Sequence, residues 1–132
     1  MLIRMVNGVV LFVQDLERCV AFYRDTVGLE VVFSDPVSVA FKMEGQDFLL
    51  LEVAAAAEMV GEEALGQHKG AGHEVLLCAD VEDVDAAYET LTAKGIAFIR
   101  PPKDQAWGLR TAYFADPQGH LWELRHTLAS AQ

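Results

Sequence analysis

Two glutamates that each end an apolar run are the first candidates for chemistry. Glu52 and Glu123 occupy these places, and the match of residues 50–52 (LLE) to residues 121–123 (LWE) predicts that they are equivalent positions of a repeated unit. Two carboxylates held close together can bind a cationic group, or one of them can have its pKa raised until it acts as a base. Arg110 and Arg125 offer another interpretation, in which the glutamates pair with them and only fix strand ends. The sequence leaves both interpretations open.

The elements that position these glutamates occur in the same order twice. Asp15 and Asp83 are typical helix N-caps, and Gly28 and Gly95 follow the apolar helix faces as C-caps. Apolar, β-branched runs predict strands at residues 9–13, 29–33, 37–43 and 47–53, and again at 74–79, 96–99, 109–115 and 120–125. Pro101-Pro102 is expected to end the strand at 96–99. The fold class is therefore α+β, with two tandem βαβββ units.

We expect the two units to lie in a single domain, residues 1–132. The units span about 6–53 and 72–126, joined by a connector at 54–71 that is rich in alanine and glycine. Two such units can form curved mixed sheets around a shared cavity, with the helices outside. The connector offers little to bury, so it is expected to be the most mobile segment.

Strand alternation predicts which side chains line that cavity. The expected ligand-binding residues are Phe12, Phe48, Glu52, Glu74, Glu123 and Arg125. The loop before residue 109 adds Trp107, which could stack on a ligand, and Arg110, which could bind an anion or brace Glu123. In the alternative, Trp107 only plugs the end of the core.

Composition excludes several classes of partner. The formal charge is −10, from 20 acidic residues against 10 Lys and Arg. An anionic membrane surface or a nucleic acid would be repelled, so neither is expected as a partner. Cys19 and Cys78 are the only cysteines, and the N-terminus carries no apolar signal segment, which predicts a cytoplasmic protein without a disulfide.

Several motifs resemble the glyoxalase / bleomycin-resistance / extradiol-dioxygenase superfamily, the vicinal oxygen chelate fold. They are residues 13–18 (VQDLER), 21–25 (AFYRD), 107–110 (WGLR) and 116–124 (DPQGHLWEL). The resemblance covers residues 6–126. It is specific for the fold but not for the activity, because members include lyases, isomerases, dioxygenases and drug-binding proteins.

The resemblance also implies where a metal would bind. Members that use a metal take one ligand from the first strand and one from the last strand of each unit. The last-strand positions are expected at Glu52 and Glu123. The first-strand ligand stands seven residues before the capping aspartate, which gives Gly8 and Leu76, and neither side chain can bind a metal. No metal site and no cofactor are therefore expected.

One alternative retains a divalent metal. It is held by Glu52 and Glu123 with a third ligand, either Glu74, which shares the face of Leu76, or His73, which would need a bulge to reach that face.

These observations predict a small-molecule-binding protein of the bleomycin-resistance kind without the usual metal, and the resemblance implies a homodimer. The rival interpretation is a metal-dependent enzyme, a lyase or isomerase of the glyoxalase kind or a related dioxygenase, that uses Glu52 and Glu123. A third is a regulator or oxidoreductase partner with no chemistry of its own.

Overall fold

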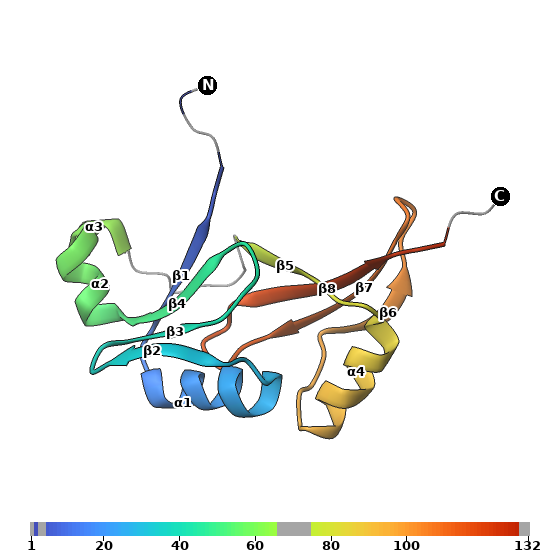
Figure 1. Cartoon of the computed structure of the whole chain (residues 1–132), viewed down its shortest axis with the longest axis horizontal. Helices are drawn as coiled ribbons and strands as arrows, with labels where there is room; N and C mark the ends of the chain where they lie inside the picture. The colour runs from blue at the N-terminus through green and yellow to red at the C-terminus, as the bar shows by residue number, and fades with distance from the viewer. Residues whose placement is uncertain (1, 3–4, 66–74, 130–132) are drawn as a thin grey trace. The chain divides into compact units, whose positions relative to one another are not determined.

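The computed structural model describes residues 2, 5–65 and 75–129, and it divides into two compact units, Met1–Gly70 and Ala71–Gln132. Each unit contains one four-stranded mixed sheet and its own helices (Figure 1). The predicted α+β class with two sheets is confirmed. His73 and Glu74 lie outside the described residues, as does most of the second half of the expected connector.

The first unit contains a sheet of strand order β1-β4-β3-β2. Its elements are β1 (Gly8–Val13), α1 (Leu16–Ala21), the π-helical continuation η1 (Phe22–Val27), β2 (Val31–Asp35), β3 (Ser38–Phe41) and β4 (Asp47–Glu52). The first and last strands pair in parallel, and the other pairs are antiparallel. This pairing places the start and the end of the βαβββ unit side by side.

The second unit repeats this topology in the order β5-β8-β7-β6. Its elements are β5 (Leu76–Asp80), α4 (Val84–Ala93), β6 (Arg100–Asp104), β7 (Leu109–Ala115) and β8 (Leu121–Thr127). Again the first strand is parallel to the last, with Cys78 opposite Glu123.

The predicted strand at residues 96–99 is wrong, because β6 begins at Arg100 and contains both prolines of the Pro101-Pro102 pair. Proline cannot donate to a sheet ladder, but an edge strand needs only one side of its backbone. β6 is such an edge strand, and its pairing with β7 shifts register between Arg100 and Lys103. The prolines are therefore tolerated within the strand.

Both predicted N-caps are present. The Asp15 carboxylate accepts the backbone N–H of Arg18, and the Asp83 carboxylate accepts those of Asp85 and Ala86. Gly28 closes the first helix at a φ of 90°, in the left-handed region that glycine occupies without strain.

Each unit has an aromatic core between its helix and one face of its sheet, here called the helix face. In the first unit Tyr23 packs on Phe41 and Phe48, with ring centroids 5.9 and 5.3 Å apart. In the second unit the rings of Tyr88, Phe98, Phe114 and Trp122 follow one another in contact. These rings fix which face of each strand points away from the helix.

The first part of the expected connector is helical. Four successive alanines, which favour helix, lie in α2 (Val53–Val60), and α3 (Glu62–Leu65) follows. Ala56 is fully buried, so α2 packs on its own unit. No helix in the described part of the chain has the length and apolar character needed to cross a bilayer.

Candidate functional site

The face of the second sheet that lies opposite α4 carries most of the unit's polar chemistry. Trp122 and Leu124 of β8 are buried and point to the helix face. Side chains alternate along a strand, so Glu123 and Arg125 point to the opposite face of the sheet. Cross-strand partners share a face. We call this surface the polar face; its residues are Leu76, Cys78, Asp80, Thr111, Tyr113, Leu121, Glu123 and Arg125.

Glu123 is the central group of the polar face. It is only 6% exposed, and its Oε2 accepts a hydrogen bond from the Tyr113 hydroxyl over 2.5 Å. Its Oε1 lies 3.7 Å from Nη1 of Arg125, an ion-pair distance rather than a hydrogen bond. A buried carboxylate needs such partners, because removing its charge from water is costly. Arg125 on the same strand, not Arg110, is therefore the arginine that pairs with Glu123.

The two neighbours of Glu123 that can lose a proton are held in their neutral forms. Burial, followed by the hydrogen bond to Glu123, raises the pKa of Tyr113. Burial, followed by the charge of Glu123, likewise raises the pKa of the Cys78 thiol above its ordinary value. At neutral pH both groups are hydrogen-bond donors, and Cys78 is not an activated nucleophile.

Glu52 and Glu123 are not at equivalent positions, and the predicted correspondence between them is wrong. Phe48 and Trp122 are the equivalent core residues, since each pairs with a buried phenylalanine on the preceding strand. Glu52 lies four residues after Phe48, whereas Glu123 lies one residue after Trp122. The two glutamates therefore differ by three residues in alignment, and an odd difference places them on opposite faces of their sheets. Glu52 lies on the helix face, opposite the buried Val13. Leu49 is the true counterpart of Glu123.

Phe48 was expected on the cavity wall and lies instead in the core of the first unit. Its side chain is 2% exposed and contacts Tyr23 and Phe41. Phe12 does point away from the helix, because its neighbours Leu11 and Val13 are the buried residues of β1. The alternation prediction holds for β1 and fails for β4.

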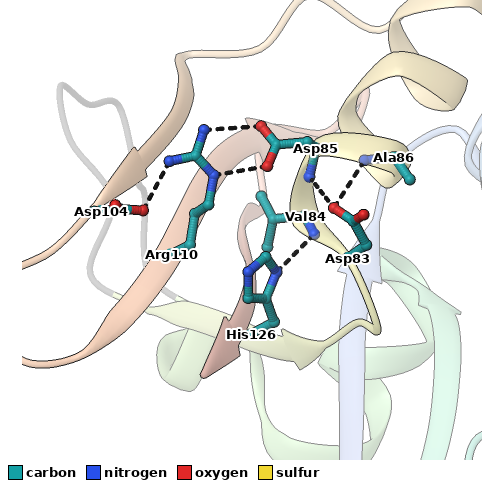
Figure 2. Close-up of polar contacts among 7 residues, drawn as sticks. All are labelled: Asp83, Val84, Asp85, Ala86, Asp104, Arg110 and His126. Carbon is teal, nitrogen blue, oxygen red and sulfur yellow. Dashed lines mark hydrogen bonds and ion pairs between the residues drawn. The ribbon is translucent and has the colours of Figure 1, made fainter. Parts of the chain in front are cut away.

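Arg110 was expected to reach a ligand or Glu123, but it lies on the helix face (Figure 2). Its guanidinium donates two hydrogen bonds of 2.8 Å to Asp85 at the start of α4, and one of 2.8 Å to Asp104 of β6. These bonds lower the pKa of Asp85 and raise that of Arg110. Beside them, the Nδ1 of His126 accepts the backbone N–H of Val84. We call this set, Asp85, Asp104, Arg110 and His126, the α4 clasp.

Trp107 lies at the tip of the tight turn between β6 and β7 and is 65% exposed, so it does not plug the core. Gly108 gives the turn its positive φ of 87° and donates its N–H to the carbonyl oxygen of Gln105. The Gln105 side chain in turn donates to the fully buried Thr111 hydroxyl on the polar face, at 3.0 Å. The turn is thus tied to that face.

The donor set does not fit the metal that the fold family implies. Glu52 was expected as the last-strand ligand of the first unit, but the structure places Leu49 at that position. The four positions are then Gly8, Leu49, Leu76 and Glu123, and only Glu123 has a side chain that can bind a metal. Within residues 5–65 and 75–129, no group of three or more His, Cys, Asp or Glu side chains is placed to hold a metal ion. A single carboxylate does not make a divalent site.

The sequence reasoning missed Tyr113, the closest partner of Glu123. The signal was available in the turn at Asp116, Pro117, Gln118 and Gly119. That turn pairs Ala115 with Leu121. Two residues further from the turn on each strand, Tyr113 must therefore lie opposite Glu123.

Known proteins share this architecture along most of the chain. Residues 5–124 match the model of the Glyoxalase/Bleomycin resistance protein/Dioxygenase superfamily. The protein YraH of Bacillus subtilis (strain 168) is 35% identical over 117 residues, which cover 86% of this chain and 91% of YraH.

Solved structures agree. A glyoxalase/bleomycin resistance protein/dioxygenase from Nocardioides superimposes with a TM-score of 0.85 and 29% identity, covering 100% of this chain and 89% of that one. A lactoylglutathione lyase from Agrobacterium tumefaciens gives a TM-score of 0.74 and 26% identity over 95% of each chain. This chain belongs to the Glyoxalase/Bleomycin resistance protein/Dioxygenase superfamily.

Proposed function

We propose that this protein binds a small organic molecule on the polar face of its second unit and needs no metal to do so. The observation that carries the proposal is Glu123, a carboxylate that is 6% exposed yet lies on the sheet face away from α4. An apolar residue at this buried position would stabilise the fold as well as the charged glutamate does. A ligand that contacts Glu123, or the side chains that Glu123 orients, would explain why a glutamate stands there.

The surroundings of Glu123 suit ligand recognition. Leu76 and Leu121 give the face apolar area, and Tyr113, Thr111 and Arg125 place polar groups at fixed positions on adjacent strands. Mostly apolar surfaces with a few oriented polar groups are typical of small-molecule sites.

A screen of small aromatic and aliphatic compounds by thermal shift, followed by calorimetry, tests the proposal. The wild-type protein should bind at least one compound saturably, and chelator should leave its affinity unchanged. Glu123→Gln should weaken that affinity by about tenfold or more, because it removes a charge that contacts the ligand or orients the groups that do, and hydrogen bonds to charged groups contribute about 1.5–3 kcal/mol. Glu89→Gln, an exposed position on α4 of the same unit, is the matched control and should bind as the wild type does.

The second candidate is a metal-dependent lyase or isomerase. The similarity to a lactoylglutathione lyase favours it, and the donor set at Gly8, Leu49 and Leu76 opposes it. Elemental analysis of protein purified without chelator separates the two. Stoichiometric Ni, Zn, Mn or Fe that disappears in Glu123→Ala would establish the metal enzyme and exclude the metal-free binder.

A further inference from the structure

The polar face carries positive charge that the chain as a whole does not. The protein has a formal charge of −10 and only 10 Lys and Arg. Arg125 lies on this face, and on the neighbouring edge strand β6 Arg100 pairs with Tyr113 and Lys103 pairs with Thr111. Directly opposed residues of an antiparallel pair share a face, so three of the ten basic residues gather here. Asp80 and Glu123 are the acidic residues of this face, so basic residues outnumber acidic ones here, whereas the chain as a whole has 20 acidic and 10 basic residues. In an acidic protein this local reversal points to an anionic partner group.

Arg125 presents unused donors on that face. A guanidinium has five N–H bonds, and in the described part of the chain Arg125 uses one of them, from Nε to the Asp80 carboxylate at 3.2 Å. Its Nη1 is 3.7 Å from Glu123, too far for a hydrogen bond. The edge formed by Nη1 and Nη2 is the one that binds a carboxylate or phosphate through two parallel hydrogen bonds. Its side chain is 37% exposed, so a ligand can reach it.

Two carboxylates hold this guanidinium in place. Asp80 pairs with it from β5, and Glu123 lies beside it on β8. Tyr113 donates to Oε2 of Glu123 and the Glu123 side chain is 8% exposed, so little of this carboxylate is open to a ligand. Asp80 is 88% exposed, so solvent screens its charge. Their shared role is to orient Arg125.

We infer that the polar face recognises an oxyanion group of its ligand, a carboxylate or a phosphate, with Arg125 as the bidentate donor and Lys103 and Arg100 adding charge at the sheet edge. This inference rests on the proposed function and names the chemical class of the ligand. Glu123 then acts as a positioning residue for Arg125 rather than as a direct contact.

Titrations followed by NMR test the inference on the intact protein. The probes are inorganic phosphate, benzoate, benzyl alcohol and benzylamine at millimolar concentration, with sodium chloride at matched ionic strength as the blank. Phosphate or benzoate should shift the Nε–Hε signal of Arg125 and the backbone amides of Thr111 and Tyr113 saturably. Which anion binds better tells a phosphate site from a carboxylate site.

Variants show whether Arg125 is the donor. Arg125→Gln should weaken anion binding by about tenfold or more. Arg125→Lys keeps the positive charge but cannot donate two parallel hydrogen bonds, so its affinity should lie between those of the wild type and Arg125→Gln. Arg24→Gln, which removes an exposed arginine paired with Asp25 in the first unit, should bind as the wild type does. Melting curves establish that each variant is folded.

Other outcomes would overturn the inference. Shifts equal to those of sodium chloride would mean general screening. Unchanged binding in Arg125→Lys would exclude the bidentate contact. Binding of benzyl alcohol or benzylamine on the polar face without binding of the anions would overturn the oxyanion inference and leave the proposed function standing. A polar face that responds to none of the probes would also overturn the oxyanion inference, whereas the proposed function fails only if the compound screen finds no ligand.

Discussion

The Tyr113 hydroxyl donates to Glu123 over 2.5 Å, and this bond should stabilise the second unit. Hydrogen bonds to charged groups contribute about 1.5–3 kcal/mol, and less where water competes. Tyr113→Phe should therefore lower the free energy of unfolding by about 1–2 kcal/mol, measured by urea denaturation. Tyr88→Phe is the matched control, because its hydroxyl makes no hydrogen bond among the described residues, and it should cost clearly less. Equal losses would show that the bond to Glu123 contributes little.

The raised pKa of the Cys78 thiol predicts how stability depends on pH. The thiol's pKa lies above its ordinary value of 9.0 in the folded protein, mainly because of burial and then because of Glu123. Near and above pH 9 the unfolded chain releases this proton more readily than the folded one, so the folded state loses stability as pH rises. The same sign holds for Tyr113 at higher pH.

Cys78→Ala removes the thiol's contribution to this decline. Free energies of unfolding measured from about pH 7 to pH 10 should fall less steeply for Cys78→Ala than for the wild type. Parallel curves for the two proteins would contradict the assignment.

Within single elements, the two faces of β1 should respond differently to the same substitution. Val13 is fully buried on the helix face, whereas Val10 is 42% exposed on the other. Threonine has the shape of valine and adds one hydroxyl. Val13→Thr should cost about 1–3 kcal/mol because the hydroxyl is buried, and Val10→Thr should stay within about 0.5 kcal/mol. Urea denaturation of both variants checks the predicted order, and a reversed order would mean that the faces are misassigned.

The α4 clasp should control how tightly the start of α4 is held against β6 and β7. Arg110 joins Asp85 of the helix to Asp104 of the edge strand. Arg110→Gln should speed amide hydrogen exchange at the first turn of α4 and raise the pKa of Asp85 toward its ordinary value of 3.8. Because the pKa of Asp85 is lowered in the folded wild type, its ion pair with Arg110 stabilises the fold fully above the unfolded-state pKa of about 3.8. This stabilisation is lost as pH falls through the lower, folded-state pKa, and the variant should lack that loss. An unchanged Asp85 titration would contradict the role of Arg110.

The sequence predicted the elements well where turn and cap chemistry is unambiguous. β7 was predicted to the residue, because the turn at Asp116 to Gly119 fixes where it ends. β6 was missed because prolines normally exclude a strand, and only its edge position permits Pro101 and Pro102 there.

The candidate site was harder to predict, because it depends on register. Local similarity around Glu52 and Glu123 suggested equivalence, whereas the core rings at Phe48 and Trp122 set an alignment that differs by three residues. An alignment error of an odd number of residues assigns each side chain to the wrong face of its strand. This one error placed both Phe48 and Glu52 on the wrong face.

Across the whole molecule, the two units have the same topology but differ in the chemistry of the faces that point away from their helices. Leu49 and Leu51 stand in the first unit where Glu123 and Arg125 stand in the second. At these two positions the first sheet is therefore apolar and the second charged.

We expect the protein to form a homodimer, as members of the family that it resembles commonly do. In the described residues, Val32 and Phe33 on edge strand β2 are 56% and 54% exposed, and such surfaces favour association. Light scattering at micromolar concentration should give twice the chain mass of 14.5 kDa. A monomer mass would refute the expectation.

The parallel pairing of β1 with β4, and of β5 with β8, has a consequence during translation. The sheet of the first unit cannot close until Glu52 has been synthesised, because its first strand needs its last. Pairing over such a span is slow compared with local helix formation. Yet every strand of that sheet is complete before Leu76 is translated, so the first unit can acquire its fold on the ribosome while the second is still being made. The strand edges of the first unit can then already be paired while those of the second unit are still being synthesised.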